Sequence, residues 1–334
     1  MNIRIALNEK EYVEEPFLRQ LERLNWRILR AGEEGKGDPK VTFREGFNEV
    51  IIEKILKESI LHINKWLEED QLPPILRELT IPNITGGLVE HNRYILEKLL
   101  ENTSAENRKT HRPDVVRFID FANPENNDFL AISQFKVNIP GTEKHIIPDI
   151  VLFINGLPIA VVECKSAYLP NPMGEAIEQL LRYQNRRGDD KEGNTKLFWF
   201  NQLLIATSRQ ICRYTSITGE FEHFIEWKDP YPHSLNDIDT EGSDSVNSQH
   251  VLIQGMLSQK AILDIIQSFI IFQESKKGKL IKILPRYQQY RTVCKIIERL
   301  KSGKSPQEKG GIVWHTQGSG KSLTMMMTVR RMYR

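Results

Sequence analysis

Three charged residues stand at the ends of two short apolar segments. Asp149 opens the segment DIVLFI, and Glu163 and Lys165 close the segment IAVVECK. Glu163 and Lys165 are two positions apart, so on a β-strand their side chains point to the same face. Hard cations such as Mg²⁺ prefer oxygen ligands, and a bound divalent cation neutralises phosphate charge and activates water. The pattern therefore favours Mg²⁺-dependent phosphodiester hydrolysis, with Asp149 and Glu163 as metal ligands and Lys165 orienting water or stabilising negative charge.

The alternative is a surface hairpin that carries ordinary charges, since a Glu-x-Lys triplet is common by chance. The apolar surroundings favour a site, because buried carboxylates repel one another unless a positive group joins them. Asn155-Gly156 between the two segments predicts a β-hairpin. A strict two-residue turn would pair Asp149 with Val162 and send Glu163 to the other face. We therefore predict an odd-length loop or a β-bulge in this hairpin.

A predicted helix follows, which Asn171-Pro172 opens and which runs to about residue 185. Gln179 and Tyr183 are four positions apart, hence on one face, with Arg182 between them. Together with the Asp, Glu and Lys pattern, this resembles the PD-(D/E)xK nucleases, one branch of which carries a QxxxY element after the active-site strands. The resemblance implies that Gln179 and Tyr183 contact DNA or support catalysis. Without it, they would be a Gln and a Tyr on a helix surface.

The same resemblance implies a mixed central sheet flanked by helices. It also implies a glutamate on the first helix that leans toward the metal. Residues 11–26 form an amphipathic pattern that predicts this helix. Glu14 is the candidate ligand there, Glu15 is an equally placed rival, and a solvated helix charge is the alternative.

A phosphate-binding loop is predicted near the other end of the sequence. Residues 311–322 read GIVWHTQGSGKS, a predicted strand at 311–314 that runs into a Gly-rich loop and then a helix. His315 stands where the strict P-loop pattern has glycine, but the segment resembles the shorter TGSGKT core of superfamily 2 helicases. Gln288, about 30 residues before the lysine, resembles their adenine-reading Q-motif. The expected nucleotide contacts are Gln288, Thr316, Gly318, Ser319, Gly320, Lys321 and Ser322, with Lys321 on the β- and γ-phosphates and Ser322 on Mg²⁺.

Three parts are predicted in this α/β chain. Residues 1–228 form the nuclease domain, with a helical region at 47–102 whose helices cover about 47–66 and 92–102. Strands are expected at 131–138 and 203–207, and a hairpin at 211–227. Residues 229–254 are expected to be an acidic linker, because 229–250 contain five carboxylates and neither Lys nor Arg. Residues 255–334 would begin a RecA-like motor domain, with helices at about 259–273 and 286–302.

The bulk composition sets limits on partners and compartment. The chain has 334 residues and a net charge of +2, so any DNA surface must be a local patch. Its three cysteines are far apart, which argues against a disulfide framework or a zinc site. No apolar stretch reaches the roughly 20 residues that a membrane span needs. We expect a cytoplasmic protein without a membrane partner.

From VEEPFLRQLERLNW at residues 13–26 to WHTQGSGKSLTM at 314–325, the combination resembles the R subunit of type I restriction enzymes. That resemblance implies double-stranded DNA as substrate, Mg²⁺ and ATP as cofactors, and methyltransferase (M) and specificity (S) subunits as partners. The motor would pull DNA toward a nuclease that cuts far from the recognition site. We expect the chain to be the N-terminal part of a longer protein, inactive as a motor and in cutting by itself. The alternatives are another nuclease–helicase fusion of repair or defence, and a DNA-binding scaffold that does not cut.

Overall fold

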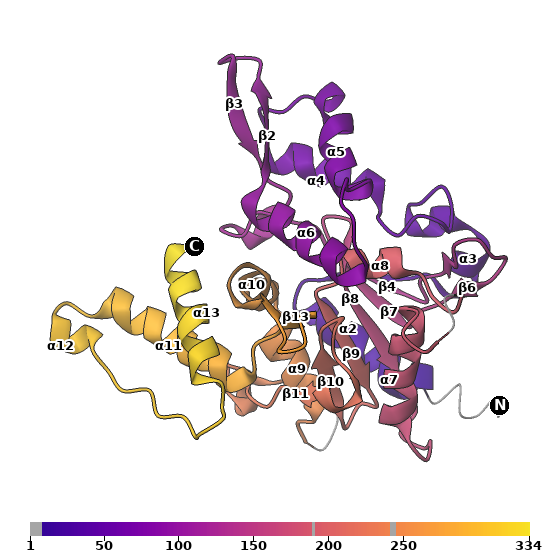
Figure 1. The fold of residues 1–334 in the computed structure, drawn as a ribbon. Coiled ribbons are helices and arrows are strands. Elements are labelled where there is room, and N and C mark those ends of the chain that lie inside the picture. The colour runs from indigo at the N-terminus through magenta and orange to yellow at the C-terminus, as the bar shows by residue number, and fades with distance from the viewer. Residues whose placement is uncertain (1–8, 189–190, 241–244) are drawn as a thin grey trace.

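A mixed seven-stranded sheet forms the centre of the fold (Figure 1). The structure, a computed structural model, describes residues 9–188, 191–240 and 245–334. β1 is parallel to β4 and β8 to β9, whereas the other neighbours are antiparallel. The strands, in sheet order, are β1 (Arg27–Arg30), β4 (Phe129–Ser133), β7 (Ile150–Ile154), β8 (Leu157–Cys164), β9 (Leu203–Thr207), β10 (Cys212–Thr215) and β11 (Ile225–Glu226). The expected α/β class with a mixed central sheet is confirmed.

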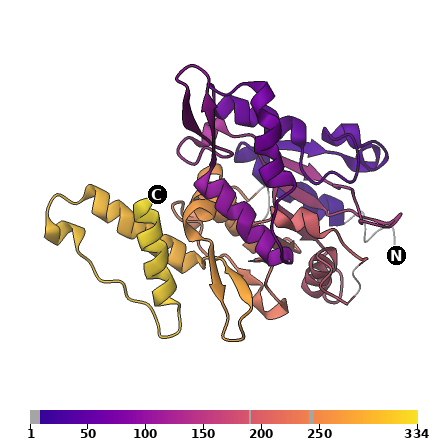
Figure 2. The same ribbon diagram turned by 45° about the horizontal axis from the view of Figure 1, so that its top comes forward.

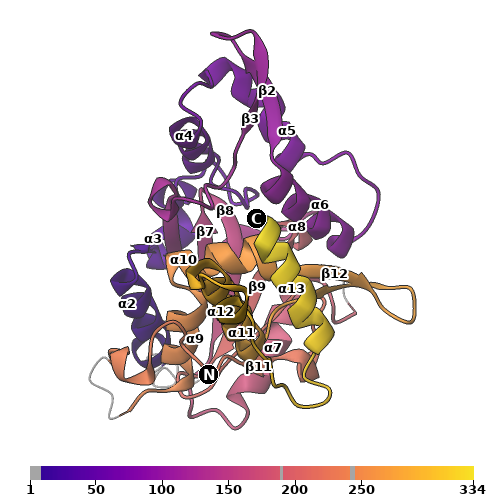
Figure 3. The same cartoon turned by 90° about the vertical axis from the view of Figure 1, so that its left-hand side faces the viewer.

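Helices cover this sheet, and every residue of β4, β7, β8 and β9 is buried. Strands buried on both faces have continuous apolar sequences, which is why these segments show no alternation. α7 (Pro172–Tyr183) packs against β8 and β9, and the side chain of Asn171 caps its first turn as expected. α2 (Glu15–Arg23) packs against β1 and against α9 (Ser248–Met256), on the side of the sheet opposite α7 (Figure 3).

The helical insertion lies between β1 and β4, and its outer part projects away from the sheet (Figure 1). Helices over 47–66 and 92–102 were predicted, and the structure has shorter or shifted ones. Pro73-Pro74 lies in the first turn of a further helix, where a missing N–H costs no hydrogen bond. The elements are α3 (Gly32–Gly37), η2 (Pro39–Thr42), α4 (Glu53–Ile63), η3 (Glu69–Gln71), α5 (Leu72–Thr80), α6 (Leu88–Glu101), β2 (Thr103–Asn107), β3 (Arg112–Val116) and η4 (Pro124–Asn126).

The strand predicted over 131–138 is interrupted. β4 ends at Ser133, and Gln134 has a left-handed φ of 56°, which turns the chain away from the sheet. The chain becomes extended again in β5 (Val137–Asn138), which forms a small hairpin with β6 (His145–Ile146). Strand β9 covers 203–207 as predicted, and α8 (Thr195–Trp199) precedes it. β10 and β11 pair antiparallel within the predicted hairpin at 211–227, with η5 (Phe221–His223) between them.

The segment after residue 245 packs on the part of the chain predicted to be the nuclease domain. The indole Nε1 of Trp26 donates to the Leu257 carbonyl at 2.8 Å, and α9 begins inside the predicted linker. Residues 241–244 of that linker lie outside the described residues, and η6 (Leu235–Asp237) precedes them. The helix predicted at 259–273 is α10 (Gln259–Asp264) followed by a π-helical turn, η7 (Ile265–Phe269). The chain then forms a hairpin of β12 (Ile271–Glu274) and β13 (Leu280–Ile283).

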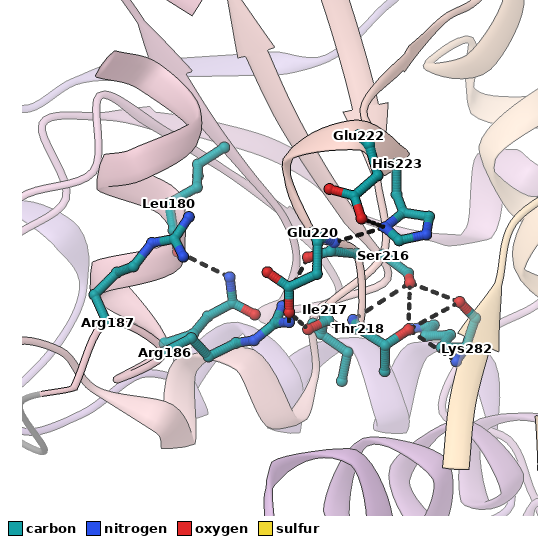
Figure 4. Close-up of polar contacts among 12 residues, drawn as sticks. Leu180, Arg186, Arg187, Ser216, Ile217, Thr218, Glu220, Glu222, His223 and Lys282 are labelled. Carbon is teal, nitrogen blue, oxygen red and sulfur yellow. Dashed lines mark hydrogen bonds and ion pairs between the residues drawn. The ribbon is translucent and has the colours of Figure 1, made fainter. Parts of the chain in front are cut away.

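A buried lysine fixes this hairpin to the rest of the fold. The Lys282 ammonium donates to Asn92 Oδ1 at 2.8 Å, to the Asn201 carbonyl at 2.9 Å and to Gln202 Oε1 at 2.7 Å. Burial lowers its pKa well below the ordinary lysine value. Figure 4 shows the hydroxyl groups of Ser216 and Thr218 directed at the Lys282 main chain, where both donate to its carbonyl oxygen.

The last residues form a projecting pair of helices, in which α11 (Tyr287–Ser302) packs against α13 (Lys321–Tyr333) beyond the short α12 (Pro306–Lys309) (Figure 2). The strand predicted at 311–314 is wrong, because this segment has no regular structure. Ile312 is 93% exposed and Trp314 is 89% exposed. An apolar strand of a parallel sheet is stable only between neighbours that cover it, and no described strand pairs with this segment.

Candidate active site

A β-bulge determines which residues meet at the end of the β7–β8 hairpin. Ile154 pairs with Leu157 around a two-residue turn, but the register shifts between Leu152 and Phe153. Ile159 is left unpaired by this shift, and Ile150 then pairs with Val162. Asp149 and Glu163 therefore face one another at the next position, and the predicted bulge is confirmed.

The turn is held from outside the hairpin. Asn155 and Gly156 both have left-handed φ, 52° and 78°, the conformation of a type I′ turn. The Gly156 carbonyl accepts from the Ile52 amide at 2.9 Å, and the Asn155 side chain donates to the Phe118 carbonyl at 2.8 Å. A Cβ on Gly156 would lie 2.5 Å from the Ile52 carbonyl oxygen. The helical insertion thus fixes the hairpin from the end opposite the charged residues.

The structure brings Asp149, Glu163 and Lys165 into one cluster. Lys165 Nζ donates to Glu163 Oε1 at 2.6 Å and lies 4.0 Å from Asp149 Oδ2. Asp149 Oδ2 also accepts from the Cys164 amide at 2.7 Å. Glu163 is 0% exposed and Lys165 is 8% exposed, so the pair is almost completely removed from water.

The first helix contributes one of its two candidate glutamates. Glu14 ends η1 (Lys10–Glu14) and is buried, and its Oε2 accepts from Gln134 Nε2 at 3.0 Å. The same amide lies 3.4 Å from Asp149 Oδ1, so Gln134 bridges the two carboxylates. Glu15 instead forms an ion pair with Arg30 at 3.0 Å. Of the two rivals, the structure places Glu14 at the cluster.

Glu9 and Gln134 belong to the cluster although no sequence pattern indicated them. Glu9 Oε2 accepts from the Ser166 amide at 3.0 Å, and its Oε1 lies 3.9 Å from Lys165 Nζ. Only the three-dimensional fold brings Glu9 to a residue 157 positions away. The one unusual local property of Gln134 is its left-handed φ, which the structure shows but the sequence does not.

Three carboxylates, those of Glu163, Glu9 and Asp149, lie within 4.0 Å of the Lys165 ammonium, and Gln134 joins a fourth, that of Glu14, to Asp149. Burial, and then the charge of Asp149, raises the pKa of Glu163 well above its ordinary value. The same two causes raise the pKa of Glu14 to about 8. Burial opposes the charge of Lys165, but Glu163 and Asp149 outweigh it, so the pKa of Lys165 is raised. The cluster has an excess of negative charge that a proton or a cation must offset.

Two carboxylate oxygens of this cluster are buried without a hydrogen-bond partner, Glu14 Oε1 and Glu163 Oε2. Unsatisfied buried oxygens are rare and call for an explanation, such as an ion. Among the described residues no group of three or more His, Cys, Asp and Glu side chains is arranged to hold a metal. Mg²⁺ commonly uses only one or two carboxylates and fills its other positions with water and phosphate oxygens. The oxygens of Asp149 and Glu163, with Glu14 beside them, fit that requirement.

Gln179 and Tyr183 support the segment that leads into the cluster. Gln179 Nε2 donates to the Tyr183 hydroxyl, which donates to the Ile147 carbonyl at 3.3 Å. Ile147 is two residues before Asp149. Burial, and then the charges of Glu163 and Asp149, raises the pKa of Tyr183, so the phenol stays protonated. The pair is placed to hold Asp149 in position.

The Gly-rich segment has the turns of a phosphate-binding loop. Gly318 and Gly320 have left-handed φ of 78° and 83°, and α13 begins at Lys321. Lys321 Nζ donates to the carbonyls of His315 and Thr316, at 2.7 and 3.3 Å. The Ser319 amide donates back to the Thr316 carbonyl, and Ser322 lies in the first turn of α13.

Gln289, the neighbour of the predicted adenine-reading Gln288, contacts this loop. Gln289 is buried, and its Nε2 lies 3.3 Å from the Gly320 carbonyl oxygen. Gln288 lines a separate hollow with Arg213 and Lys228 at the sheet edge. An adenine contact of Gln288 stays a prediction.

Comparison with known proteins identifies the family. Residues 6–223 match the family described as Type I restriction enzyme R protein N terminus. The chain belongs to this family. Residues 288–334, which include the Gly-rich loop, match the family described as SWI2/SNF2 ATPase.

The relatives of this R-protein N-terminal chain are named as endonuclease subunits. It is 30% identical over 326 residues to the type I restriction enzyme HindI endonuclease subunit of Haemophilus influenzae. It is 27% identical over 349 residues to the putative type I restriction enzyme MjaIXP endonuclease subunit of Methanocaldococcus jannaschii. These matches cover 96% and 97% of the chain but only 29% and 31% of the relatives, so it spans less than a third of their length.

Two further expectations concern cysteines and membranes. Cys164, Cys212 and Cys294 are all buried and free, in agreement with the absence of disulfides expected from their spacing. None of the helices in the described part of this R-protein chain is both long and apolar enough to cross a membrane.

Proposed function

We propose that this chain carries the DNA-cutting site of a type I restriction R subunit, a PD-(D/E)xK nuclease that hydrolyses phosphodiester bonds of double-stranded DNA with Mg²⁺. The single observation that carries the proposal is the arrangement at the end of the β7–β8 hairpin. There, Asp149 and Glu163 face each other beside Lys165, and Glu163 has a buried oxygen without a partner. A structural ion pair would need one carboxylate for one lysine, whereas this cluster gathers an excess of acids.

Asp149 and Glu163 would hold the Mg²⁺ ion, and Glu14 would contribute from the first helix. Bound there, Mg²⁺ would neutralise charge on the scissile phosphate and lower the pKa of a water molecule. Lys165, released from Glu163 when that carboxylate binds the cation, would donate to the attacking water or to the phosphate oxygens. The Cys164 amide and Gln134 keep Asp149 oriented through two hydrogen bonds. Tyr183 and Gln179 act through Ile147 as positioning residues.

The Gly-rich loop would bind ATP for a translocating motor whose remainder lies in a longer protein. Thr316, Gly318, Ser319 and Gly320 would surround the phosphates, with Lys321 and Ser322 at the β- and γ-phosphates and the Mg²⁺ ion. In the assembled enzyme, the partners would be methyltransferase and specificity subunits. This assignment rests on the family match and on the names of the relatives. Three free buried cysteines suit the reducing cytoplasm that we propose as its compartment.

Metal binding by the chain itself tests the first part. Titration with Mn²⁺, followed by electron paramagnetic resonance, should give one site in the wild type and a loss of at least tenfold in affinity in Glu163→Gln. Glu58→Gln is the control, because Glu58 is an exposed residue of α4. Equal binding by all three proteins would contradict the site.

Cutting of supercoiled plasmid by the full-length protein with its partners tests the second part. The wild type should cut in the presence of ATP and Mg²⁺, whereas Lys165→Ala should not. A wild-type assembly that binds Mn²⁺ but never cuts would favour a DNA-binding scaffold.

A further inference from the structure

A cleft opens beside the acidic cluster, between the β5–β6 hairpin and helix α7. Its volume is about 640 Å³. One wall is the hairpin with the segment that follows it, and the other is the last turn of α7 with the chain beyond it. Its lining includes Lys144, His145, Ile147, Gln179, Arg182 and Tyr183.

The cleft leads to the proposed catalytic residues. Its floor includes Tyr183 and Ile147, which the hydrogen bond from the phenol to the carbonyl joins. Two residues beyond Ile147 the chain reaches Asp149. Tyr183 lines the cleft, and burial and the nearby charges of Glu163 and Asp149 contribute to its raised pKa, so the phenol is close to these carboxylates. A ligand in this cleft would therefore end next to the acidic cluster.

Two cations on opposite walls have no acidic partner. Lys144 on the hairpin and Arg182 on α7 are both exposed, and neither forms an ion pair with any residue that the structure describes. The next arginines along the chain differ, since Arg186 pairs with Glu220 and Arg187 pairs with Glu178. Glu143 and Glu192 also line the cleft and lower its net charge, whereas Lys191 and, when protonated, His145 add to it.

We propose that this cleft binds the sugar–phosphate backbone of one DNA strand and directs it to the acidic cluster, with Lys144 and Arg182 each contacting a phosphate. The inference rests on the proposed nuclease function and adds the surface that receives the substrate. Arg and Lys contacts to phosphates fix the register of DNA without reading its sequence. Such contacts suit a nuclease domain that cuts wherever DNA is presented to it.

The polyanion fits this cleft better than a small anion does. Both cations are exposed and stand on separate elements, so neither belongs to a closed, desolvated pocket of the kind that small ligands use. Affinity for DNA arises mainly from counterion release, which needs only cations placed along the path of the strand.

Fluorescence anisotropy with a labelled duplex of about 30 base pairs tests the proposal, in Ca²⁺ to prevent cutting. The double variant Lys144→Ala/Arg182→Ala should bind at least tenfold more weakly than the wild type. Its plot of log affinity against log salt should be less steep by about 1.8, since each lost phosphate contact removes about 0.9. Lys54→Ala/Arg77→Ala is the matched control, because it removes one exposed lysine and one exposed arginine from the helical insertion.

Equal losses of duplex affinity in the two double variants, or a wild-type chain that does not bind the duplex, would overturn the proposal that this cleft binds DNA. The Mn²⁺ titration separates this failure from failure of the nuclease site. If the chain binds Mn²⁺ but the cleft substitutions do not weaken duplex binding, only the proposed DNA path is wrong and the metal site stands. Loss of Mn²⁺ binding in the cleft variant would mean that the substitutions had damaged the cluster itself. Arg182→Lys/Lys144→Arg, which keeps both charges, should then restore the metal site and the duplex affinity together if the cleft is correct.

Discussion

Two lysines of this chain stand at candidate phosphate-handling sites, and their surroundings differ in almost every respect. Lys165 is buried, 2.6 Å from Glu163, at the end of a strand paired on both sides. Lys321 lies at the start of α13, where its ammonium donates to two main-chain carbonyls of its own loop. The first belongs to a completed sheet, and the second follows a segment that pairs with no described strand.

The contrast separates two ways in which a motif is held. At the β7–β8 hairpin, neighbouring strands, the helical insertion and the first helix all constrain the charged residues, so their positions do not depend on a ligand. At the Gly-rich loop, glycine conformations and contacts from α11 form the turn, and no described strand lies beside it. A single substitution at the β7–β8 hairpin should therefore lower the stability of the chain strongly. A single substitution in the Gly-rich loop should lower it only slightly.

The largest expected effect is on cutting. In the assembled full-length enzyme, Glu163→Gln should lower the rate of plasmid cutting by at least about 10²–10³-fold, the size of losing one pre-organised electrostatic group. Glu163→Gln keeps the shape of the side chain but removes the charge that would hold the cation. The rate in single-turnover plasmid assays measures this, with Glu58→Gln as control. Full activity in Glu163→Gln would remove the proposed role of Glu163.

The next effect is on stability at the turn. Gly156→Ala should lower the free energy of unfolding by about 2–4 kcal/mol, because it adds left-handed strain and a close contact with the insertion. Its Cβ would lie 2.5 Å from the Ile52 oxygen and 2.9 Å from the Leu56 nitrogen. Gly278→Ala is a matched control, since Gly278 also has a left-handed φ, 72°, but nothing within 4 Å of a new Cβ. Urea unfolding that gives the same loss in both variants would show that the insertion does not clamp this turn.

A smaller effect is a pH dependence from Glu14. Its pKa in the folded chain is about 8, against an ordinary value of 4.5. The folded state therefore binds the proton more tightly, so the stability contribution is complete below pH 4.5 and is lost as the pH rises through about 8. In metal-free buffer, the slope from this group approaches at most about 1.4 kcal/mol per pH unit.

Glu14→Gln should remove the contribution of Glu14 to the slope of unfolding free energy against pH. Glu163 should leave a residual slope of the same sign. Denaturant unfolding at a series of pH values measures both. Glu11→Gln, an exposed change on the same helix, should keep the wild-type slope. If Glu14→Gln and the wild type have identical slopes, Glu14 ionises as a solvated residue does.

The smallest expected effect is that of Lys321→Ala on stability. Lys321 is exposed and has no acidic partner in the described part of the chain. The free energy of unfolding should change by no more than about 0.5 kcal/mol. Lys165→Ala should destabilise the chain by several-fold more, because it leaves buried carboxylates without their cation. Equal effects in thermal unfolding would erase the distinction between the two regions.

Local sequence was sufficient wherever the determining contacts are local. The two continuous apolar runs on either side of Asn155-Gly156 predicted the hairpin, and the need for Asp149 and Glu163 to share a face predicted the bulge. The capped helix after Asn171 followed from the same kind of reasoning. These predictions depend on turn chemistry and periodicity over a few residues.

Contacts between segments far apart in the sequence could not be predicted from local sequence patterns. Glu9 meets Ser166 only because the first helix packs beside the end of β8, and nothing near Glu9 indicates that position. The choice between Glu14 and Glu15 also depended on where the helix docks. The strand predicted at 311–314 failed for the reverse reason, since its apolar residues have no neighbouring strand to cover them.

Lys282 connects β13 to two other segments of the fold through buried hydrogen bonds. Its three acceptors come from α6 and from the two residues before β9, so withdrawing β13 would remove the ammonium and leave three buried acceptors without their donor, at a cost of about 1–3 kcal/mol each. These three segments must therefore separate together. Tension applied to the chain beyond β13 passes through Lys282 to Gln202, and the next residue begins the strand that lies beside β8. A pull on the projecting helices would thus reach β10 through the Tyr214–Pro285 hydrogen bond and, through Lys282, the strand next to Glu163.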